Sequence, residues 1–377
     1  ADGDVPDVAL AVAPFQASMQ STMLDLGQFL DADTLRADFG DYLVSLGTVG
    51  SGGAWPSQDG VIHTIPFHLG LKGLVYYPKA AFDDAGYEVP STWAELMVLS
   101  TQMVADGHSP WCFGFESGVA SGWPGTDLIE GLVLRTSGVD VYDEWTFGTR
   151  PFTSPGVLAA ARLADDLIFE PGFVRNGPGS ISNTLYTDPL FPMLQRNSAT
   201  GEPAPQCWLV TQSDILFPEV PPDVELGVDL DVFPLPPVDP RRATATTGGV
   251  FFAGAFVDRP EVRAFMEFMA SPEWGEAWAA EPIPGTFVSP NRRFDPTTYG
   301  GGVDSPVRTV QLAMHAELRA AIDAGTFRHD ASDLMPGPIG TFNDDFTPGA
   351  FWTGMVDWVD GRRTIEDVFA DIDDAWA

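Results

Sequence analysis

Aromatic side chains stand next to single polar groups in a glycine-rich segment, residues 113–127. The segment reads Phe-Gly-Phe-Glu-Ser-Gly-Val-Ala-Ser-Gly-Trp-Pro-Gly-Thr-Asp and carries Glu116, Ser117, Trp123 and Asp127. Glycine permits close backbone approach, the polar groups supply donors and acceptors, and an indole offers a stacking plate. The segment is therefore a candidate ligand-binding loop. The alternative is a simple turn in which Asp127 caps the following helix.

Three further places could contribute to such a site. Trp208, in Gln206-Cys207-Trp208, offers a second indole for a cleft or for the core. Gly248 and Gly249 follow Thr247 and can present backbone N–H groups to a hydroxyl or form a turn before a strand that runs to Val257.

Trp352 follows Phe351 and precedes a helical pattern. Phe351 and Met355 share one helix face, whereas Trp352 points about 100° away. We predict that Phe351 anchors this segment in the core and that Trp352 reaches a cleft, so that its truncation weakens ligand binding and leaves stability unchanged. The alternative is that Trp352 is itself a core residue.

Composition excludes several classes of function. The 377 residues include 53 acidic and 19 basic ones, a net charge of −34. Nucleic-acid binding is excluded because phosphate would be repelled. The sequence has no apolar run near 18 residues, so we predict no membrane span. The motifs of serine hydrolases, zinc proteases, dinucleotide-binding and phosphate-binding loops are absent, and the five histidines lack metal-ligand spacing. We expect no cofactor, no metal and no catalytic residues.

Cys112 and Cys207 are the only cysteines. Both begin strand-like runs that can neighbour each other in one sheet. In an oxidising compartment they could form a disulfide with Cα atoms within about 7 Å. The alternative is two buried free thiols.

Strands alternate with helices along the chain, which predicts α/β architecture. Expected strands cover residues 8–12, 62–67, 74–77, 112–115, 207–211 and 228–236. Thr92 and Glu95 form a capping box that opens a helix ending at Gly107, and further helices are expected at 154–168, from Pro260, from Pro306 to Gly325, and at 364–377.

Motifs spread over nearly the whole chain resemble those of extracellular solute-binding proteins of the family-1 carbohydrate type, in particular the α-glucoside-binding, maltose-binding-protein-like branch. The segments that carry the resemblance include Val5-Pro-Asp-Val-Ala, Leu74-Val-Tyr-Tyr, Pro90-Ser-Thr-Trp-Ala-Glu-Leu96, Gly122-Trp-Pro-Gly-Thr-Asp127, Tyr142-Asp-Glu-Trp145, Pro205-Gln-Cys-Trp, Pro272-Glu-Trp, Ser289-Pro-Asn, and Asp333-Leu-Met-Pro followed by Phe351-Trp352.

The resemblance implies a type II periplasmic-binding-protein fold with two lobes, joined by a hinge of about three crossovers, that close on a sugar. The first lobe would comprise residues 1–109 and 250–302, and the second residues 110–249 and 303–377. Cys112 and Cys207 would pair within the second lobe. Trp208 and Trp352 match cleft-facing or stacking positions, Glu116 and Ser117 match a hydroxyl-binding loop, and Lys72 and Gly249 lie where first-lobe contacts are made.

Two departures from the family pattern matter. Members begin with a strand, a helix and a second strand ahead of the segment that starts at Val5, so we expect the first lobe to be incomplete and the strand at 8–12 to lie at a sheet edge. In close relatives Asp follows the Gly-Gly loop, whereas Val250 follows it here, which predicts either a different sugar from theirs or none.

The implied function is an extracytoplasmic receptor, periplasmic or lipid-anchored at the cell surface. It would bind an α-glucoside such as maltose, trehalose or sucrose as a monomer and deliver it to the permease subunits of an ABC importer. One alternative is a sensory sugar-binding module of a larger protein. The enzymatic alternative is a glycoside hydrolase, although with 53 carboxylates a pair at a suitable distance is no argument for hydrolysis.

Overall fold

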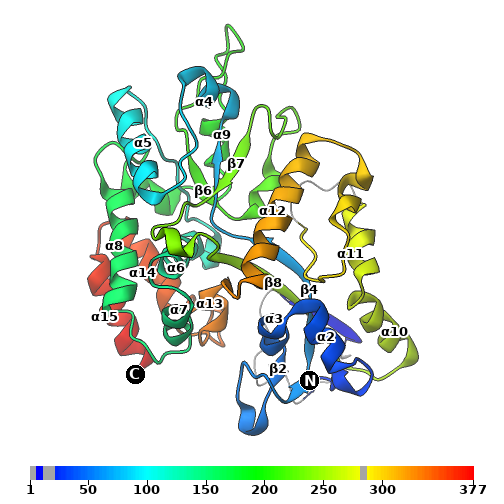
Figure 1. Ribbon diagram of the computed structural model, residues 1–377. Helices are drawn as coiled ribbons and strands as arrows, with labels where there is room; N and C mark the ends of the chain where they lie inside the picture. The colour runs from blue at the N-terminus through cyan, green and yellow to red at the C-terminus, as the bar shows by residue number, and fades with distance from the viewer. Residues whose placement is uncertain (1–5, 12–21, 281–286) are drawn as a thin grey trace. The chain divides into compact units, whose positions relative to one another are not determined.

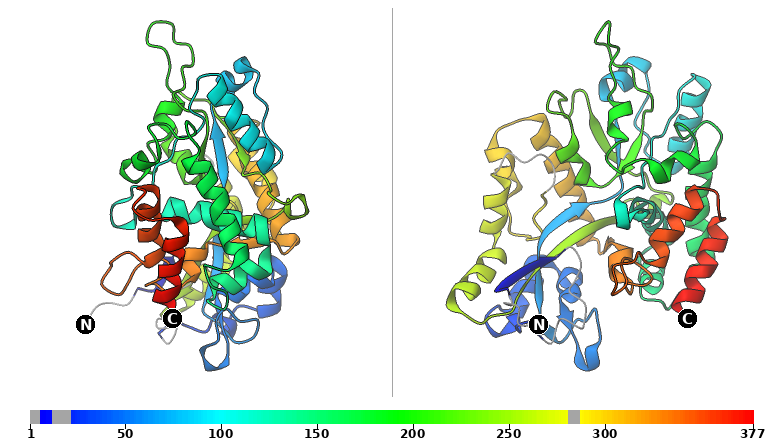
Figure 2. Two further views of the ribbon diagram at one scale, coloured as in Figure 1. Left: turned by 90° about the vertical axis from the view of Figure 1, so that its left-hand side faces the viewer. Right: turned by 180° about the vertical axis from the view of Figure 1, so that it is seen from behind.

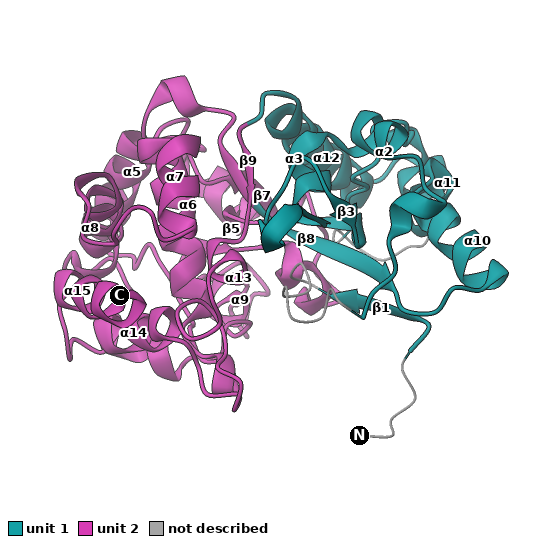
Figure 3. Cartoon of the chain, turned by 90° about the horizontal axis from the view of Figure 1, so that it is seen from below, with its two compact units in different colours: residues 1–70, 248–325 teal, residues 71–247, 326–377 magenta. Residues whose placement is uncertain are grey.

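The computed structural model describes residues 6–11, 22–280 and 287–377, which form helices and strands in two compact units (Figure 1). Unit 1 comprises residues 1–70 and 248–325, and unit 2 comprises residues 71–247 and 326–377 (Figure 3). The chain passes from one unit to the other three times, as expected. The α/β fold class is confirmed.

The unit boundaries differ from the lobe boundaries implied by the resemblance, because residues 71–109 pack in unit 2 and residues 303–325 in unit 1. Helix α5 (Trp93–Ala105) explains the first difference. It buries Trp93 and Leu96 in the same hydrophobic cluster as Trp111 of unit 2. Burial of these large apolar side chains fixes the helix to that core.

The sheet of unit 1 is built around one long central strand. Strand β8 (Thr246–Ala255) pairs with β1 (Val8–Ala11) and with β4 (Thr64–Leu71), whereas the short strand β9 (Phe327–His329) belongs to unit 2. β1 runs antiparallel to β8 and lies at the edge of this sheet within the described residues (Figure 2). The expected edge position is confirmed for residues 8–11, and Val12 lies outside the described residues.

The helices of unit 1 follow the expected local signals. In α12 (Pro306–Asp323), the Ser305 hydroxyl accepts a hydrogen bond from the backbone N–H of Arg308, and the chain leaves the helix at Gly325 with φ of 71°. These are a serine N-cap and a left-handed glycine stop. The other regular elements of unit 1 are α2 (Ala32–Phe39), α3 (Asp41–Leu46), β2 (Thr48–Val49), β3 (Val61–Ile62), α10 (Pro260–Met269) and α11 (Pro272–Ala279).

A second sheet lies entirely in unit 2. Strand β5 (Leu74–Tyr77) pairs antiparallel with β6 (Val210–Gln212) on one side and with β7 (Asp231–Pro234) on the other. The strand expected at 112–115 does not form. The backbone N–H of Cys112 donates to Leu209, whereas that of Phe115 donates to Ile181. Because successive residues bond to different segments, no continuous ladder arises.

Helix α6 (Trp123–Ser137) is the central helix of unit 2, and three other helices pack against it: α7 (Val139–Thr146), α8 (Pro155–Phe169) and α14 (Ala350–Val359). The α14 and α15 helices lie side by side in every view (Figures 1 and 2). The capping box of Thr92 and Glu95 at the start of α5 is confirmed. The remaining helices of unit 2 are α4 (Lys79–Ala85), α9 (Leu190–Met193), α13 (Ala331–Leu334) and α15 (Ile365–Trp376).

The predicted disulfide is present in unit 2. Cys112 and Cys207 are bonded, and their Cα atoms lie 5.8 Å apart. No helix in the described ranges has both the length and the apolar composition that a membrane span requires.

Candidate ligand-binding site in unit 2

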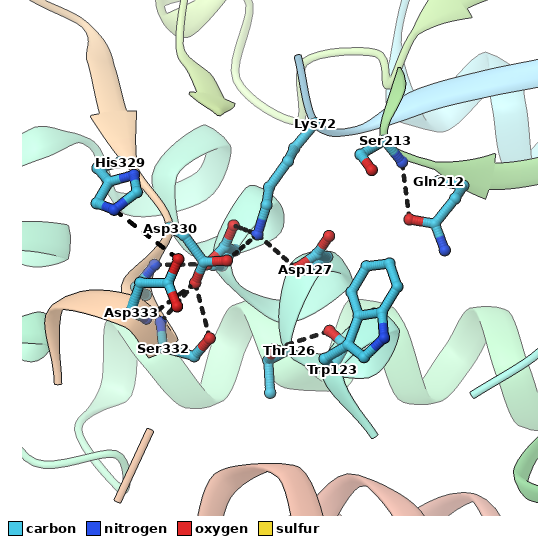
Figure 4. A network of polar contacts seen from close by, with 12 residues as sticks. Lys72, Trp123, Thr126, Asp127, Gln212, Ser213, His329, Asp330, Ser332 and Asp333 are labelled. Carbon is cyan, nitrogen blue, oxygen red and sulfur yellow. Dashed lines mark hydrogen bonds and ion pairs between the residues drawn. The ribbon is translucent and has the colours of Figure 1, made fainter. Parts of the chain in front are cut away.

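Lys72 lies at the centre of a buried charge cluster in unit 2. It follows β4 directly, and its backbone N–H donates to the carbonyl of Thr247 at 3.1 Å. Its ammonium donates to Asp127 at 2.6 Å, to Glu130 at 3.3 Å, and to Asp330 (Figure 4). All four side chains are nine-tenths buried or nearly so. A buried ammonium needs such partners, because desolvation would otherwise expel the charge.

Two elements bring these carboxylates together. Asp127 and Glu130 are three residues apart on α6 and so share one helix face. Asp330 caps α13, where its Oδ1 accepts from the backbone N–H groups of Ser332 and Asp333. Glu130 also accepts from the backbone N–H of Ala331 at 2.6 Å, which fixes α13 to α6.

The acidic side chains of the cluster differ in their pKa values. Burial raises the pKa of Asp127 to about 6, although the Lys72 ammonium opposes the rise. Burial and the charge of Asp330 raise the pKa of Glu130 well above its usual value. The same two causes raise the pKa of Asp333 well above its usual value. Burial alone would raise the pKa of Asp330, but the charge of Lys72, the charge of His329 and the hydrogen bonds from Lys72 and Ser332 together lower it. The cluster therefore raises the proton affinity of Glu130 and Asp333 and lowers that of Asp330.

The pKa of Lys72 results from the same competition. Burial disfavours its charged form, but the surrounding carboxylates outweigh burial and raise its pKa well above the usual value. One oxygen each from Asp127, Glu130 and Asp330 lies within 4.8 Å of the others, a spacing that could hold a metal ion. The ammonium contacts all three carboxylates and supplies the positive charge that a metal ion would bring.

One oxygen of the cluster is left over. Oδ2 of Asp127 is buried and has no hydrogen-bond partner among the described residues. Leaving a buried acceptor unsatisfied costs about 1–3 kcal/mol. The arrangement can therefore accept one more hydrogen bond, from a hydroxyl or an amide.

Trp123 occupies the first turn of the same helix, four residues before Asp127 and on the same face. Its indole is half-buried and meets the ring of Tyr186 edge to face, with centroids 5.2 Å apart. Figure 4 shows Trp123 next to Asp127. An indole face and a free carboxylate oxygen thus stand together at the start of α6.

The start of α6 is fixed by Gly122. This residue has φ of 104°, and a Cβ atom on it would lie 2.0 Å from the carbonyl oxygen of Trp352. Only glycine fits this conformation and this close approach. The predicted alternative in which Asp127 caps a helix is wrong, because the helix begins at Trp123 and Asp127 lies in its second turn.

Glu116 and Ser117 form the turn before α6. Oε1 of Glu116 accepts from the backbone N–H of Gly118 at 2.8 Å, and the backbone N–H of Ser117 donates to the hydroxyl of Ser121 at 2.9 Å. Both residues are half-buried. Their polar groups hold the loop in shape and leave the Glu116 carboxylate a second oxygen.

Trp208 is placed in the core. It is 4% exposed and packs against Tyr87 and His108, with ring centroids 5.1 and 4.8 Å away. Its expected place in a ligand cleft is not supported, because these rings cover it. The apolar residues around Cys207 contain no signal that distinguishes a cleft position of Trp208 from a core position.

Trp352 is buried as well. Phe351 and Met355 are fully buried in the core cluster, as predicted. The indole of Trp352 is 8% exposed and meets Phe342 edge to face at 4.9 Å. The expectation that its truncation leaves stability unchanged is therefore revised, since the ring contributes packing on its own side of α14.

Gly248 and Gly249 lie in unit 1, inside β8. They form neither a turn nor the approach to a strand, because β8 already begins at Thr246. A Cβ atom on Gly249 would meet only the Phe251 ring, at 3.8 Å. Space beside this strand is thus open at Gly249.

Sequence reasoning missed Glu130, Asp330 and Asp333. A signal for Glu130 was available, since it interrupts the apolar run Leu128-Ile-Glu-Gly-Leu-Val133. A carboxyl in such a run must find a partner when the helix is buried. Nothing local points from α6 to residues 330–333, which lie about two hundred positions away in the sequence.

Comparisons with known proteins agree with this architecture. The model of a family described as bacterial extracellular solute-binding protein matches residues 1–276. The α-glucosides-binding periplasmic protein AglE of Rhizobium meliloti is 34% identical over 319 residues, which are 84% of this chain and 63% of AglE. The osmoprotective compounds-binding protein GgtB of Synechocystis sp. is 30% identical over 95% of this chain and 77% of GgtB. The chain thus spans less than two thirds of AglE.

Solved structures share the fold. The solute receptor AcbH, described as having an exclusive preference for β-D-galactopyranose, superposes with a TM-score of 0.72 at 17% identity, over 98% of this chain and 84% of AcbH. The maltose-bound MalE3 of T. maritima gives a TM-score of 0.63 at 20% identity, over 98% of this chain and 84% of MalE3. At these identities the likeness concerns the fold alone.

Proposed function

This chain belongs to the family of bacterial extracellular solute-binding proteins, and on that basis we propose that it binds a saccharide outside the cytoplasm for an ABC importer. The relatives that support this proposal are binding proteins rather than enzymes. Permease subunits of the importer are the proposed protein partners.

The proposed ligand class is an α-glucoside, such as maltose, trehalose or sucrose. Its support is the identity of 34% to a protein named for binding α-glucosides. GgtB, at 30% identity, is named for osmoprotective compounds, so small polyhydroxylated solutes are the wider class to be tested.

The observation that carries the proposed site is the pairing of Trp123 with the free Oδ2 of Asp127 on one face of α6. The indole face complements the C–H face of a pyranose, and the carboxylate oxygen accepts a hydrogen bond from a ring hydroxyl. Lys72 takes the other oxygen of Asp127 and so orients the carboxylate.

Other residues stay in the proposed set with smaller roles. Glu116 and Ser117 would contact hydroxyls from the loop before α6, and Gly248, Gly249 and Trp352 would contribute as the family resemblance implies. Trp208 is withdrawn because it belongs to the core.

Calorimetric titration of the protein with maltose, trehalose, sucrose, glucose and galactose tests the proposal. We expect one of the disaccharides to bind more tightly than either monosaccharide. Trp123→Ala should weaken that binding by about 1–3 kcal/mol, the range of aromatic stacking contacts, and Trp123→Phe should restore part of it.

Failure of all five sugars to bind would refute the proposed ligand class. Unchanged affinity in Trp123→Ala would remove Trp123 from the site. Release of reducing sugar from a bound disaccharide over hours would favour the glycosidase alternative, and its absence agrees with a receptor.

A further inference from the structure

Unit 2 contains a second place where polar and aromatic groups converge, apart from the Lys72 cluster. It is a cavity of about 310 Å³, within the size range of small-molecule sites. Five of its lining residues carry the argument: Arg175, Asn176, Asp188, Phe113 and Phe191. None of them belongs to the proposed saccharide site at α6.

Arg175 differs from most of the arginines of this acidic protein. Most of the others, such as Arg150, Arg196 and Arg328, pair with a carboxylate. Within the described ranges, the guanidinium of Arg175 forms no ion pair and donates instead to the neutral amide oxygen of Gln206. Its remaining N–H groups can therefore serve a ligand in the cavity.

Asp188 faces the same cavity, yet no ion pair joins it to Arg175 in the described part of the chain. Two opposite charges that line one cavity without touching leave room for a group that both accepts and donates. For a carboxylate or phosphate ligand the attraction to Arg175 would be offset by repulsion from Asp188, and for a simple cation the attraction to Asp188 would be offset by repulsion from Arg175. A neutral polyol can hydrogen-bond to both Arg175 and Asp188, because each hydroxyl donates as well as accepts.

An aromatic face completes the set. Phe191 on α9 lines the cavity and is 56% exposed, so its ring is accessible to a ligand. Phe113 lines it from the segment next to Cys112 and is stacked on Trp111, with centroids 5.5 Å apart. Aromatic rings flanked by charged planar groups suit a sugar ring, whose C–H face is apolar and whose rim is polar.

The cavity wall is held by covalent and hydrogen-bonded constraints. Gln206, which orients Arg175, precedes Cys207 of the disulfide, and the partner Cys112 lines the cavity. The backbone N–H of Gln206 also donates to the carbonyl of Pro192 at 2.8 Å. Asn176 adopts a left-handed conformation with φ of 64°, which asparagine tolerates better than most other residues and which fixes the turn at the cavity wall.

We infer that this cavity is a second saccharide-binding pocket, in which Arg175 and Asp188 bind ring hydroxyls and Phe191 packs against the ring. The pocket is independent of the proposed site at α6. It would allow one chain to hold two sugar rings at separate places.

Equilibrium dialysis against radiolabelled maltose, up to millimolar concentration, tests the inference on the whole protein. Maltose binding that survives Trp123→Ala is expected. Arg175→Met should weaken this residual binding at least about tenfold, as for loss of a charged donor, and Phe191→Ala should weaken it as well. Arg196→Met is the matched control, because Arg196 pairs with Asp229 and does not line the cavity.

The outcomes separate the two sites. Maltose binding that survives in Trp123→Ala and is lost when Arg175→Met is added to that variant supports the pocket, whether or not the site at α6 also takes maltose in the parent protein. Binding lost in Trp123→Ala and unchanged in Arg175→Met and Phe191→Ala overturns it. Equal melting temperatures of the variants and the control show that a loss is not caused by unfolding. Asn176→Asp adds a second carboxylate to the cavity lining, and it should also weaken the residual binding if Arg175→Met fails to fold.

Discussion

The ammonium of Lys72 lies 2.6 Å from Oδ1 of Asp127, and both side chains are about nine-tenths buried. The pair unites a segment that follows β4 with the second turn of α6. It also leaves the other carboxylate oxygen of Asp127 without a partner among the described residues. One ion pair thus serves the stability of unit 2 and orients the oxygen proposed to receive a sugar hydroxyl.

Replacing Lys72 by Met should destabilise the protein by about 3–5 kcal/mol, because Asp127, Glu130 and Asp330 lose their shared cation. Since the pKa of Lys72 is raised, its contribution is fully present at any pH below 10.5. The carboxylates left behind can take up protons in acid, so the loss should be larger at pH 8 than at pH 5. Urea unfolding at both pH values measures it.

The chain offers a matched control for this experiment. Lys79 is the only other lysine and forms a surface ion pair with Asp83, four residues away at 3.1 Å. Lys79→Met should cost less than about 0.5 kcal/mol, as exposed pairs do. Equal losses in the two variants would contradict the structural role assigned to the cluster.

Asp214 should make stability fall as pH rises. Burial raises its pKa to about 8, although its Oδ2 accepts from the backbone N–H of Leu71 at 3.0 Å. Between its ordinary pKa of 3.8 and about 8, the folded state therefore holds one more proton than the unfolded state. That difference lowers the free energy of unfolding by about 1.4 kcal/mol per pH unit at most.

Asp214→Asn keeps the acceptor for Leu71 and mimics the protonated acid. The variant should gain stability relative to the parent protein as pH increases from 5 to 7, measured by urea denaturation at each pH. Parallel pH profiles of the two proteins would show that Asp214 does not titrate in this range.

Trp352→Ala should now lower the stability of the unliganded protein by about 3–5 kcal/mol, the usual loss for a buried Trp. Thermal melts measure the stability loss, and sugar titration of the same variant below its melting temperature tests the proposed ligand contact separately. An unchanged melting temperature would mean that the indole carries little of the packing seen against Phe342.

Reduction of the Cys112–Cys207 bond should cost about 2–4 kcal/mol, because the bond closes a loop of 95 residues in the unfolded chain. Cys112→Ser with Cys207→Ser should show the same loss without reductant. The unreduced parent protein should give no titratable thiol, and one or two thiols per chain would contradict the assignment.

The sequence was sufficient for features that depend on neighbours along the chain. The capping box at Thr92, the stop at Gly325 and the burial of Phe351 with Met355 all follow from spacings of three or four residues. The disulfide was predictable because only two cysteines exist.

Features that depend on distant partners were not predictable. The backbone N–H of Cys112 donates to the carbonyl of Leu209, whereas that of Phe115 donates to the carbonyl of Ile181. Residues 112–115 therefore do not form the expected strand. Lys72 and Asp127 were both named as ligand contacts, yet they bind each other. Pairings across 55 or more positions are set by the packing of whole elements, and local patterns carry little information on them.

The burial of Lys72 has a practical consequence for labelling this protein. Of its two lysine amines, one is sequestered and held in the protonated, non-nucleophilic form, while the Lys79 side chain remains 32% accessible. An amine-reactive fluorophore should therefore modify a single lysine, at the start of α4 in unit 2, besides the α-amino group. The dye on Lys79 has a defined position and gives an optical reporter of ligand binding without any engineered cysteine to compete with the native disulfide.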